Sequence, residues 1–264
     1  MRAQALRRPV PCRPRQRGLT LIELLVSMAI AVFLLGGLLT ILGNTRRVFG
    51  AQNSMAQFQD NQRLVMTLLG DVIQQAGYFP NPTVNVATTA LPVAGVTFPT
   101  AGQAITGTYQ AAVPNDTITV RFATTQNDGV INCTGGSNTT TVAPPLVYVN
   151  RFSIDAAGNL VCTLTANGVV APPVTLVSGI QGQPGIQNLQ ILYGVTTNPA
   201  AGTGAVDTYL RADQVTATNN WLNVASVKVR VTFNNPLSGQ PGQQATTVPF
   251  ERVIGVMNHT GVKL

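Results

Sequence analysis

A long apolar run at residues 19–42 constrains this chain more than any other feature of its sequence. As an α-helix, its 24 residues would be about 36 Å long, enough to cross a hydrocarbon core of about 30 Å. The preceding segment, 1–18, is basic and contains no acidic residue. By the positive-inside rule this segment stays cytoplasmic, and the chain after residue 42 is exported. The segment holds six arginines: Arg2, Arg7, Arg8, Arg13, Arg15 and Arg17.

The charge distribution separates this leader from the rest of the chain. The formal net charge is +7, a value that by itself suggests a nucleic-acid-binding protein. Six of the 16 basic residues lie in 1–18, so the remaining chain has 10 basic and 9 acidic residues and a net charge of +1. With 45% hydrophobic and 9% charged residues, the chain is too apolar for a disordered protein. The sequence gives no support for nucleic-acid binding.

The order of segments at the N-terminus differs from an ordinary secretory signal, in which the small cleavage-site residue follows the apolar stretch. Here Gly18 precedes it, so cleavage after Gly18 would leave the hydrophobic helix on the mature protein. Glu23 is the one ionisable residue in the run. It could pair with the amino terminus created before Leu19, in its own chain or a neighbouring subunit. Alternatively, it is a helix-start carboxylate favoured by the helix dipole.

Residues 17–26, Arg-Gly-Leu-Thr-Leu-Ile-Glu-Leu-Leu-Val, resemble the class III signal of type IV pilins and pseudopilins. The resemblance implies that a prepilin peptidase cuts after Gly18 and methylates the new N-terminal residue, Leu19, where the family more often has Phe or Met. It also implies that Glu23 is the carboxylate needed for docking into a growing filament.

Beyond Gly43 the pattern becomes amphipathic. Apolar residues recur at steps of three and four, as on one face of a helix, and residues 15–79 contain no proline. We therefore predict one helix from 19 to about 77, with a membrane or filament-core part at 19–43 and an amphipathic part at 44–78. The predicted stripe is Val48, Ala51, Met55, Phe58, Gln62, Val65, Leu69, Val72 and Ala76.

Residues 79–264 predict a mostly antiparallel β domain, which makes the fold α+β, a pilin-like lollipop. No second helix is predicted, and an inserted β-subdomain is possible around 85–145. Alternation predicts strands at 117–123, 152–154, 160–162, 189–195, 227–233 and within 246–257, with a turn near Gly158 that requires positive φ. The Gly/Pro/Asn-rich segments 124–145, 179–185, 196–206 and 234–245 predict exposed loops.

The order of features in this β domain resembles the PilW class of minor pilins. The quoted features are the cysteine-containing hairpin, Ile-Leu-Tyr-Gly at 191–194, Asp-Thr-Tyr-Leu at 207–210, Trp221 and Val-Ala-Ser-Val-Lys-Val-Arg-Val at 224–231. Read without the resemblance, each strand is simply part of a β core, and Tyr193 and Trp221 are core residues.

Three cysteines are present, and Cys12 would leave with the leader. Cys133 and Cys162 remain on the exported side, where disulfides persist. A bond between them would close a loop of about 30 residues and contribute about 3–4 kcal/mol in the chain-entropy model. Two buried free thiols are the alternative.

No catalytic arrangement is recognisable. The single histidine, His259, and two usable cysteines make a zinc site improbable, and no phosphate-binding loop is present. We expect no enzyme activity, cofactor or metal.

The leading hypothesis is a minor pilin that helps initiate or cap a type IV pilus. Its implied partners are other pilins and minor pilins, the prepilin peptidase and the assembly platform. Its implied location is the bacterial inner membrane, as a single-pass protein with a periplasmic C-terminal domain, and then the filament or its tip. The first alternative is a minor pseudopilin of a type II secretion system. A periplasmic enzyme or binding protein with an uncleaved anchor, and a DNA-binding pilin, are further alternatives.

Overall fold

The computed structural model describes residue 18 and residues 20–111, 115–141, 145–179, 185–197, 205–238, 242 and 245–257. The chain divides into two compact units, with the boundary between Gly50 and Ala51. His259, Cys12 and Leu19 lie outside the described residues.

The first unit is helical throughout its described part beyond Thr20. Helix α1 spans Leu21–Gln74 and continues into the second unit without a break. Over 21–50 every described side chain is exposed, although most are large and apolar. An 18-residue window of α1 reaches a mean hydropathy of 2.6, which makes the helix apolar and long enough to cross a membrane. The glycines at 36, 37 and 43 lie within the helix and do not interrupt it.

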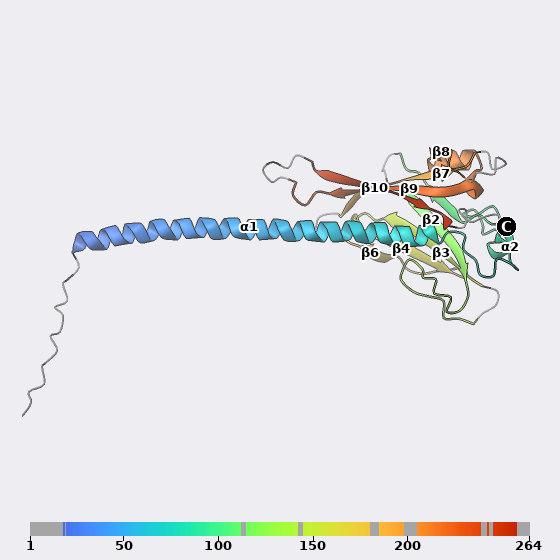
Figure 1. The fold of residues 1–264 in the computed structure, drawn as a ribbon, viewed down its shortest axis with the longest axis horizontal. Coiled ribbons are helices and arrows are strands. Elements are labelled where there is room, and N and C mark those ends of the chain that lie inside the picture. The colour runs from blue at the N-terminus through green and yellow to red at the C-terminus, as the bar shows by residue number, and fades with distance from the viewer. Residues whose placement is uncertain are drawn as a thin grey trace, which may run out of the picture. The chain divides into compact units, whose positions relative to one another are not determined.

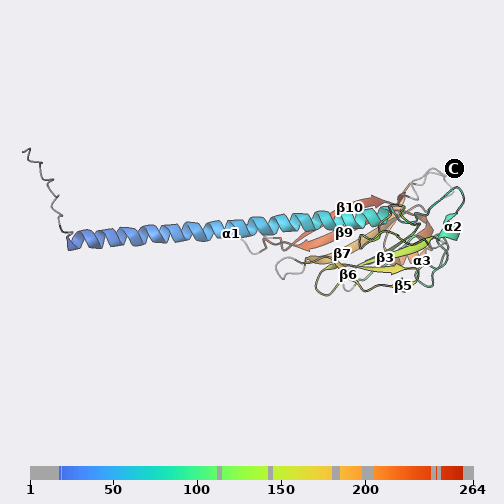
Figure 2. The same ribbon diagram turned by 90° about the horizontal axis from the view of Figure 1, so that it is seen from below.

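The second unit contains two antiparallel sheets (Figures 1 and 2). The first sheet has the order β1-β2-β3-β4-β5, with β6 also paired to β4; the second has the order β10-β9-β7-β8. The strands of the first sheet are β1 (Ile105–Thr108), β2 (Thr117–Thr124), β3 (Leu146–Ile154), β4 (Leu160–Ala166), β5 (Val169–Val170) and β6 (Val174–Val177). Those of the second are β7 (Ile186–Val195), β8 (Thr208–Leu210), β9 (Val224–Asn234) and β10 (Thr247–Gly255).

The C-terminal part of α1 packs on these sheets. Phe58 makes edge-to-face contacts with Phe233 of β9 and Phe250 of β10, at centroid distances of 5.8 and 6.3 Å. Asn61 donates a hydrogen bond to the carbonyl of Ser178, just after β6. The predicted stripe is confirmed from Phe58 onward, whereas Val48 is exposed. The buried members are Phe58, Gln62, Val65, Leu69, Val72 and Ala76.

The period-2 patterns predicted the main strands correctly. In β9 the valines at 227, 229 and 231 are buried, because alternate side chains of a strand point to opposite faces of the sheet. The turn between β3 and β4 places Gly158 at φ 76°, as predicted. Tyr193 and Trp221 lie in the core, in edge-to-face contact at 4.8 Å.

Two predictions about the β domain were wrong. The domain contains the short helices α2 (Ala87–Ala90) and α3 (Ala212–Ala217) and a 3-10 turn at Trp221–Asn223. Helices of four and six residues complete too few turns to produce a recognisable periodicity. The segment 124–145 is not simply an exposed loop, because Cys133 and Asn138 within it are buried. Asn138 holds it to the sheet by donating to the carbonyl of Thr124.

Arg121 is the largest fully buried side chain in the described structure. From β2 its guanidinium donates to the carbonyls of Gln103 and Pro92, both at 2.6 Å, and of Leu91 at 3.1 Å. It also stacks over the Phe98 ring, 4.2 Å from the centroid. Burial lowers the pKa of Arg121 to about 10. The three nitrogens of one guanidinium thereby tie the irregular segment 91–103 to the first sheet.

Candidate filament-docking site

The predicted processing site lies immediately before α1. Gly18 is exposed and has no regular secondary structure, and no side chain or distant backbone atom lies within 4 Å of the position a Cβ would occupy there. The Gly18–Leu19 bond and the methylation of Leu19 remain predictions, because Leu19 lies outside the described residues.

Thr20 and Glu23 cap the start of α1 together. The Thr20 backbone amide and hydroxyl both donate to Glu23 Oε2 at 2.9 Å, and the Glu23 amide donates to Thr20 Oγ1 at 3.4 Å. This reciprocal arrangement is a capping box, which satisfies backbone donors that have no partner within the helix. Sequence reasoning did not identify Thr20, although the spacing Thr20-x-x-Glu23 is the signature of this motif.

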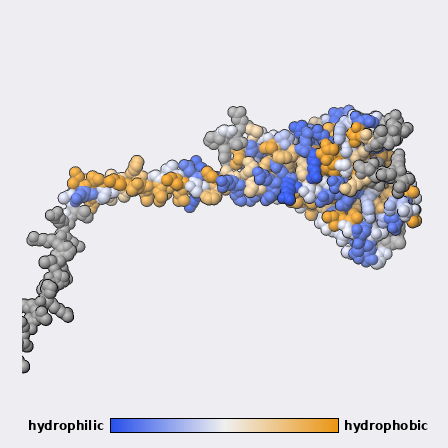
Figure 3. Space-filling view, viewed as in Figure 1, coloured by the Kyte–Doolittle hydropathy of each residue, from blue (hydrophilic) through white to orange (hydrophobic). Residues whose placement is uncertain are grey.

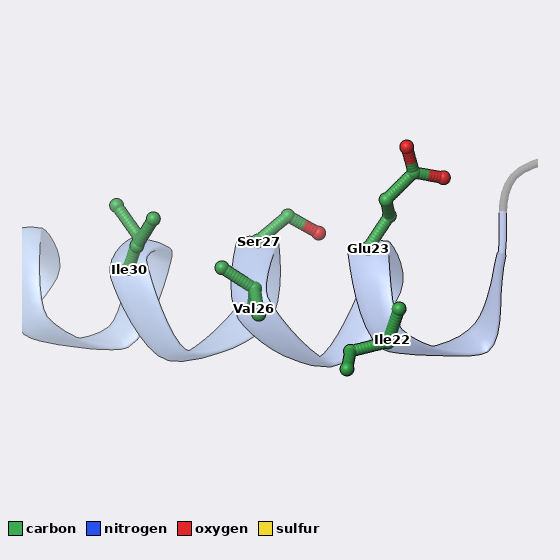
Figure 4. Close-up of a pocket in the computed structure, with 5 residues that line it drawn as sticks. All are labelled: Ile22, Glu23, Val26, Ser27 and Ile30. Carbon is green, nitrogen blue, oxygen red and sulfur yellow. The ribbon is translucent and has the colours of Figure 1, made fainter.

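Glu23 stands on a helix face that is otherwise mostly apolar. Ile22, Val26 and Ile30, at i, i+4 and i+8, lie beside Glu23 and Ser27 along one open groove (Figure 4). The Glu23 carboxylate extends away from the helix axis (Figure 4). Both bonds from Thr20 end on Oε2, which leaves Oε1 in position for an external donor. The face therefore combines a broad apolar contact surface with one negative charge.

The hydroxyls farther along the apolar segment are satisfied within the helix. Ser27 donates to the Leu24 carbonyl, and Thr40 donates to the Gly36 carbonyl, each at 2.9 Å. In lipid, polar groups need internal partners because the bilayer core holds no water to bond them. The segment is therefore compatible with a hydrocarbon environment and with a packed helical one.

The structure contains a disulfide between Cys133 and Cys162, whose Cα atoms are 6.3 Å apart. It joins the 131–138 segment to β4, and the Cys133 amide also donates to Asn150 Oδ1 of β3. The predicted pair is confirmed, and the alternative of two free thiols was wrong.

A second cleft, of about 230 Å³, lies at the edge of β7. Asp116 is its one buried carboxylate and accepts hydrogen bonds from the amides of Ile191 (2.8 Å) and Gln110 (3.2 Å). Burial raises the pKa of Asp116, against the effect of those amides. The basic side chains nearby are paired, Arg211 with Asp213 and Lys228 with Glu251, each at 3.0 Å. Because these charged side chains already pair with one another, the cleft offers few charged groups to a ligand.

Metal-ligating side chains do not cluster in the part of the chain that the structure describes: no three His, Cys, Asp or Glu residues lie close enough to hold an ion. The groove at Glu23 is the candidate site that coincides with the motif singled out in the sequence.

Two known families match parts of the chain. Residues 13–39 match the family described as Prokaryotic N-terminal methylation motif. Residues 148–254, which run from β3 to β10, match the family described as Type IV Pilus-assembly protein W. No curated protein and no solved structure matches the chain. The chain carries a PilW domain behind a prepilin methylation motif, and it is a minor pilin of type IV pilus assembly.

Proposed function

We propose that this minor pilin helps to initiate or cap the pilus, and that it does so as a structural subunit rather than an enzyme. The observation that carries the proposal is the exposed apolar part of α1, with its single carboxylate at Glu23, lying within the methylation motif. Its partners are other pilins and minor pilins, the prepilin peptidase and the assembly platform in the inner membrane.

In the proposed pathway the prepilin peptidase removes residues 1–18 and methylates Leu19. The apolar helix then holds the subunit in the inner membrane, with the PilW domain in the periplasm. On assembly, contacts with neighbouring helices replace contacts with lipid, so the driving force is close packing and polar pairing rather than burial from water.

Glu23 serves two purposes in this pathway. Before assembly its carboxylate caps its own helix through Thr20. In the filament it also accepts a hydrogen bond from the methylated amine of a neighbouring subunit. A charge-assisted hydrogen bond of this kind is about twice as strong as a neutral one. Because apolar contacts alone do not fix how far one helix slides along the other, this bond sets the axial register of the two helices.

The first test is mass spectrometry of the protein purified from piliated cells. We expect a mature chain that begins at Leu19 and carries one added methyl group. A chain that retains residues 1–18 in assembled pili would overturn the proposal.

The second test compares Glu23→Val and Glu23→Gln with a control, Ser27→Ala, which alters the only other polar side chain of the same groove. We expect both Glu23 variants to be inserted and processed but to lose incorporation into sheared pili by at least about tenfold. Ser27→Ala should be incorporated normally. Normal incorporation of Glu23→Val would exclude a docking role for the carboxylate.

The assignment to pilus initiation or capping requires a strain that lacks this chain. We expect surface pili and twitching to be lost while secretion of enzymes through a type II system continues. The reverse outcome would identify the chain as a secretion pseudopilin.

A further inference from the structure

A short polar segment of α1, residues 44–50, separates the apolar part of the helix from the part that packs in the second unit. Its sequence is Asn-Thr-Arg-Arg-Val-Phe-Gly, and its side chains are exposed. A hydrophilic patch follows the hydrophobic stretch along α1 in Figure 3. The nearest buried residue beyond it is Ser54. This segment therefore lies neither in the apolar stretch nor in the core of the β domain.

Arg46 and Arg47 dominate the charge of this part of the helix. No acidic residue occurs between Glu23 and Asp60, and no other basic residue occurs between Thr20 and Arg63. None of the ion pairs in the described structure involves Arg46 or Arg47. The two guanidinium groups are thus an isolated pair of cations.

Helix geometry places this pair at the level of lipid headgroups. Residues 21–43 of α1 have a length of about 34 Å, close to the hydrocarbon thickness of about 30 Å. Arg46 and Arg47 follow Gly43 by three and four residues, or about 5–6 Å along the axis.

The proposed processing makes this placement unusual. Once residues 1–18 are removed, the span has no basic side chain at its cytoplasmic end, and its two flanking arginines lie at the exported end. The positive-inside rule acts through the leader of the uncleaved chain and leaves these two arginines at the exported surface, where a local negative charge would stabilise them. The phosphate of a phospholipid supplies it, because a guanidinium matches a phosphate with two parallel hydrogen bonds.

We propose that Arg46 and Arg47 bind the phosphate headgroup of an anionic phospholipid in the outward-facing leaflet. The bound lipid fixes the depth of the unassembled subunit and is released when the subunit leaves the membrane. Its location in that leaflet rests on the proposed orientation and processing, whereas binding to the arginine pair itself does not.

The test uses the full chain in nanodiscs of phosphatidylcholine with about one third phosphatidylglycerol. The phosphatidylglycerol supplies the negative surface charge that attracts basic residues. Native mass spectrometry measures the preference for phosphatidylglycerol among the lipids retained on the released protein. One basic residue at an anionic surface favours binding by about fivefold, so Arg46→Gln/Arg47→Gln should lower this preference by up to about 25-fold. High salt, which shortens the Debye length to about 3 Å at 1 M, should lower it too.

Arg63→Gln is the matched control, because Arg63 is an exposed arginine of the same helix that lies in the second unit. It should leave the lipid preference unchanged. Hydrogen exchange should show added protection of amides 44–50 in the anionic nanodiscs for the wild type and the Arg63 variant only. A wild-type midpoint of urea unfolding, followed through Trp221 fluorescence, in each variant would establish that the β domain is folded.

Equal lipid preference in the wild type and the double variant would overturn the proposal, as would an equal loss in the Arg63 variant. If the double variant keeps its lipid preference but loses crosslinks to another pilin, the partner of the pair is a carboxylate of that pilin instead. The nanodisc result does not depend on whether the Glu23 variants are incorporated into pili. The lipid-binding proposal and the proposed docking function can therefore fail separately.

Discussion

The two parts of helix α1 are continuous in backbone but differ in what covers them. From Leu21 to Gly50 the described side chains are exposed, and the apolar residues surround the helix up to about Gly43. From Ala51 to Gln74 the apolar residues form a stripe that packs on the two sheets. A helix that is apolar on all sides requires a partner outside its own chain, whereas a striped helix finds its partner within the chain.

The covered part of α1 contributes to folding, whereas the exposed part is available for assembly. Burial of a large aliphatic side chain contributes about 1.5–3 kcal/mol, and Val65, Leu69 and Ile73 are fully buried. The second part of α1 is therefore part of the folded domain. The first part makes no comparable contribution within its own chain and remains available to lipid or to neighbouring helices.

The largest expected difference between the two parts comes from a pair of matched truncations. Leu69 is 0% exposed and Leu39 is 60% exposed. Leu69→Ala should lower the free energy of unfolding of the β domain by about 2–5 kcal/mol, because it leaves a cavity. Leu39→Ala should change it by less than about 0.5 kcal/mol. Urea titration in detergent, followed through Trp221 fluorescence, measures both, and equal effects would contradict the division.

Removing the disulfide tests whether the second unit can be weakened without affecting the first. Replacing Cys133 and Cys162 by serine should destabilise the β domain by about 3–4 kcal/mol, since the bond closes a loop with a sequence separation of 29. Membrane insertion of the apolar helix should be unchanged. Urea titration and alkaline extraction of membranes measure the two properties. A variant that unfolds at the wild-type urea concentration would contradict this expectation.

Arg121 tests the junction at which α1 joins the first sheet, where the Gly77 amide donates to the Arg121 carbonyl. Arg121→Met should cost about 3 kcal/mol, because it leaves buried carbonyls without a donor. Arg121→Lys should recover only part of this loss, since an ammonium cannot reproduce the guanidinium fork. Arg151→Met, at an exposed arginine of β3, is the control. Protease resistance of segment 91–103 would report the same loss locally.

The smallest expected effect is a pH dependence that belongs to the second unit alone. Because burial raises the pKa of Asp116, the folded state binds its proton more tightly than the unfolded state. The free energy of unfolding should therefore fall as pH rises from the ordinary value of 3.8 through the folded pKa. Asp116→Asn should remove that decline in a series of urea titrations.

Asp213 provides a control of opposite sign. The hydrogen bond from Arg211 lowers the pKa of Asp213, so its contribution to stability is lost as pH falls through the folded pKa. Asp213→Asn should remove that loss at low pH. If Asp116→Asn and Asp213→Asn changed the pH dependence in the same direction, the assignment of Asp116 would be wrong.

Local patterns were sufficient to predict much of this fold. The apolar run, the stripe from Phe58 to Ala76 and the alternation at 227–233 each depend on which neighbours share a face, a property that sequence spacing determines. The capping partner Thr20 was also within reach of such reasoning, because its signature involves only residues three apart. The short helices α2 and α3 were not, because they complete too few turns.

The amino-acid sequence alone determined that this chain has a basic leader, an apolar helix with one acidic residue, and a cysteine pair able to bond. Only the tertiary structure decided that Arg121 is buried among carbonyls, that Asn138 holds its segment against the sheet, and that Asp116 lies at the edge of β7. The physical reason is the range of the contacts. Spacing along the chain fixes helix faces and strand faces, but partners 14 to 75 residues apart are brought together only when the sheets pack.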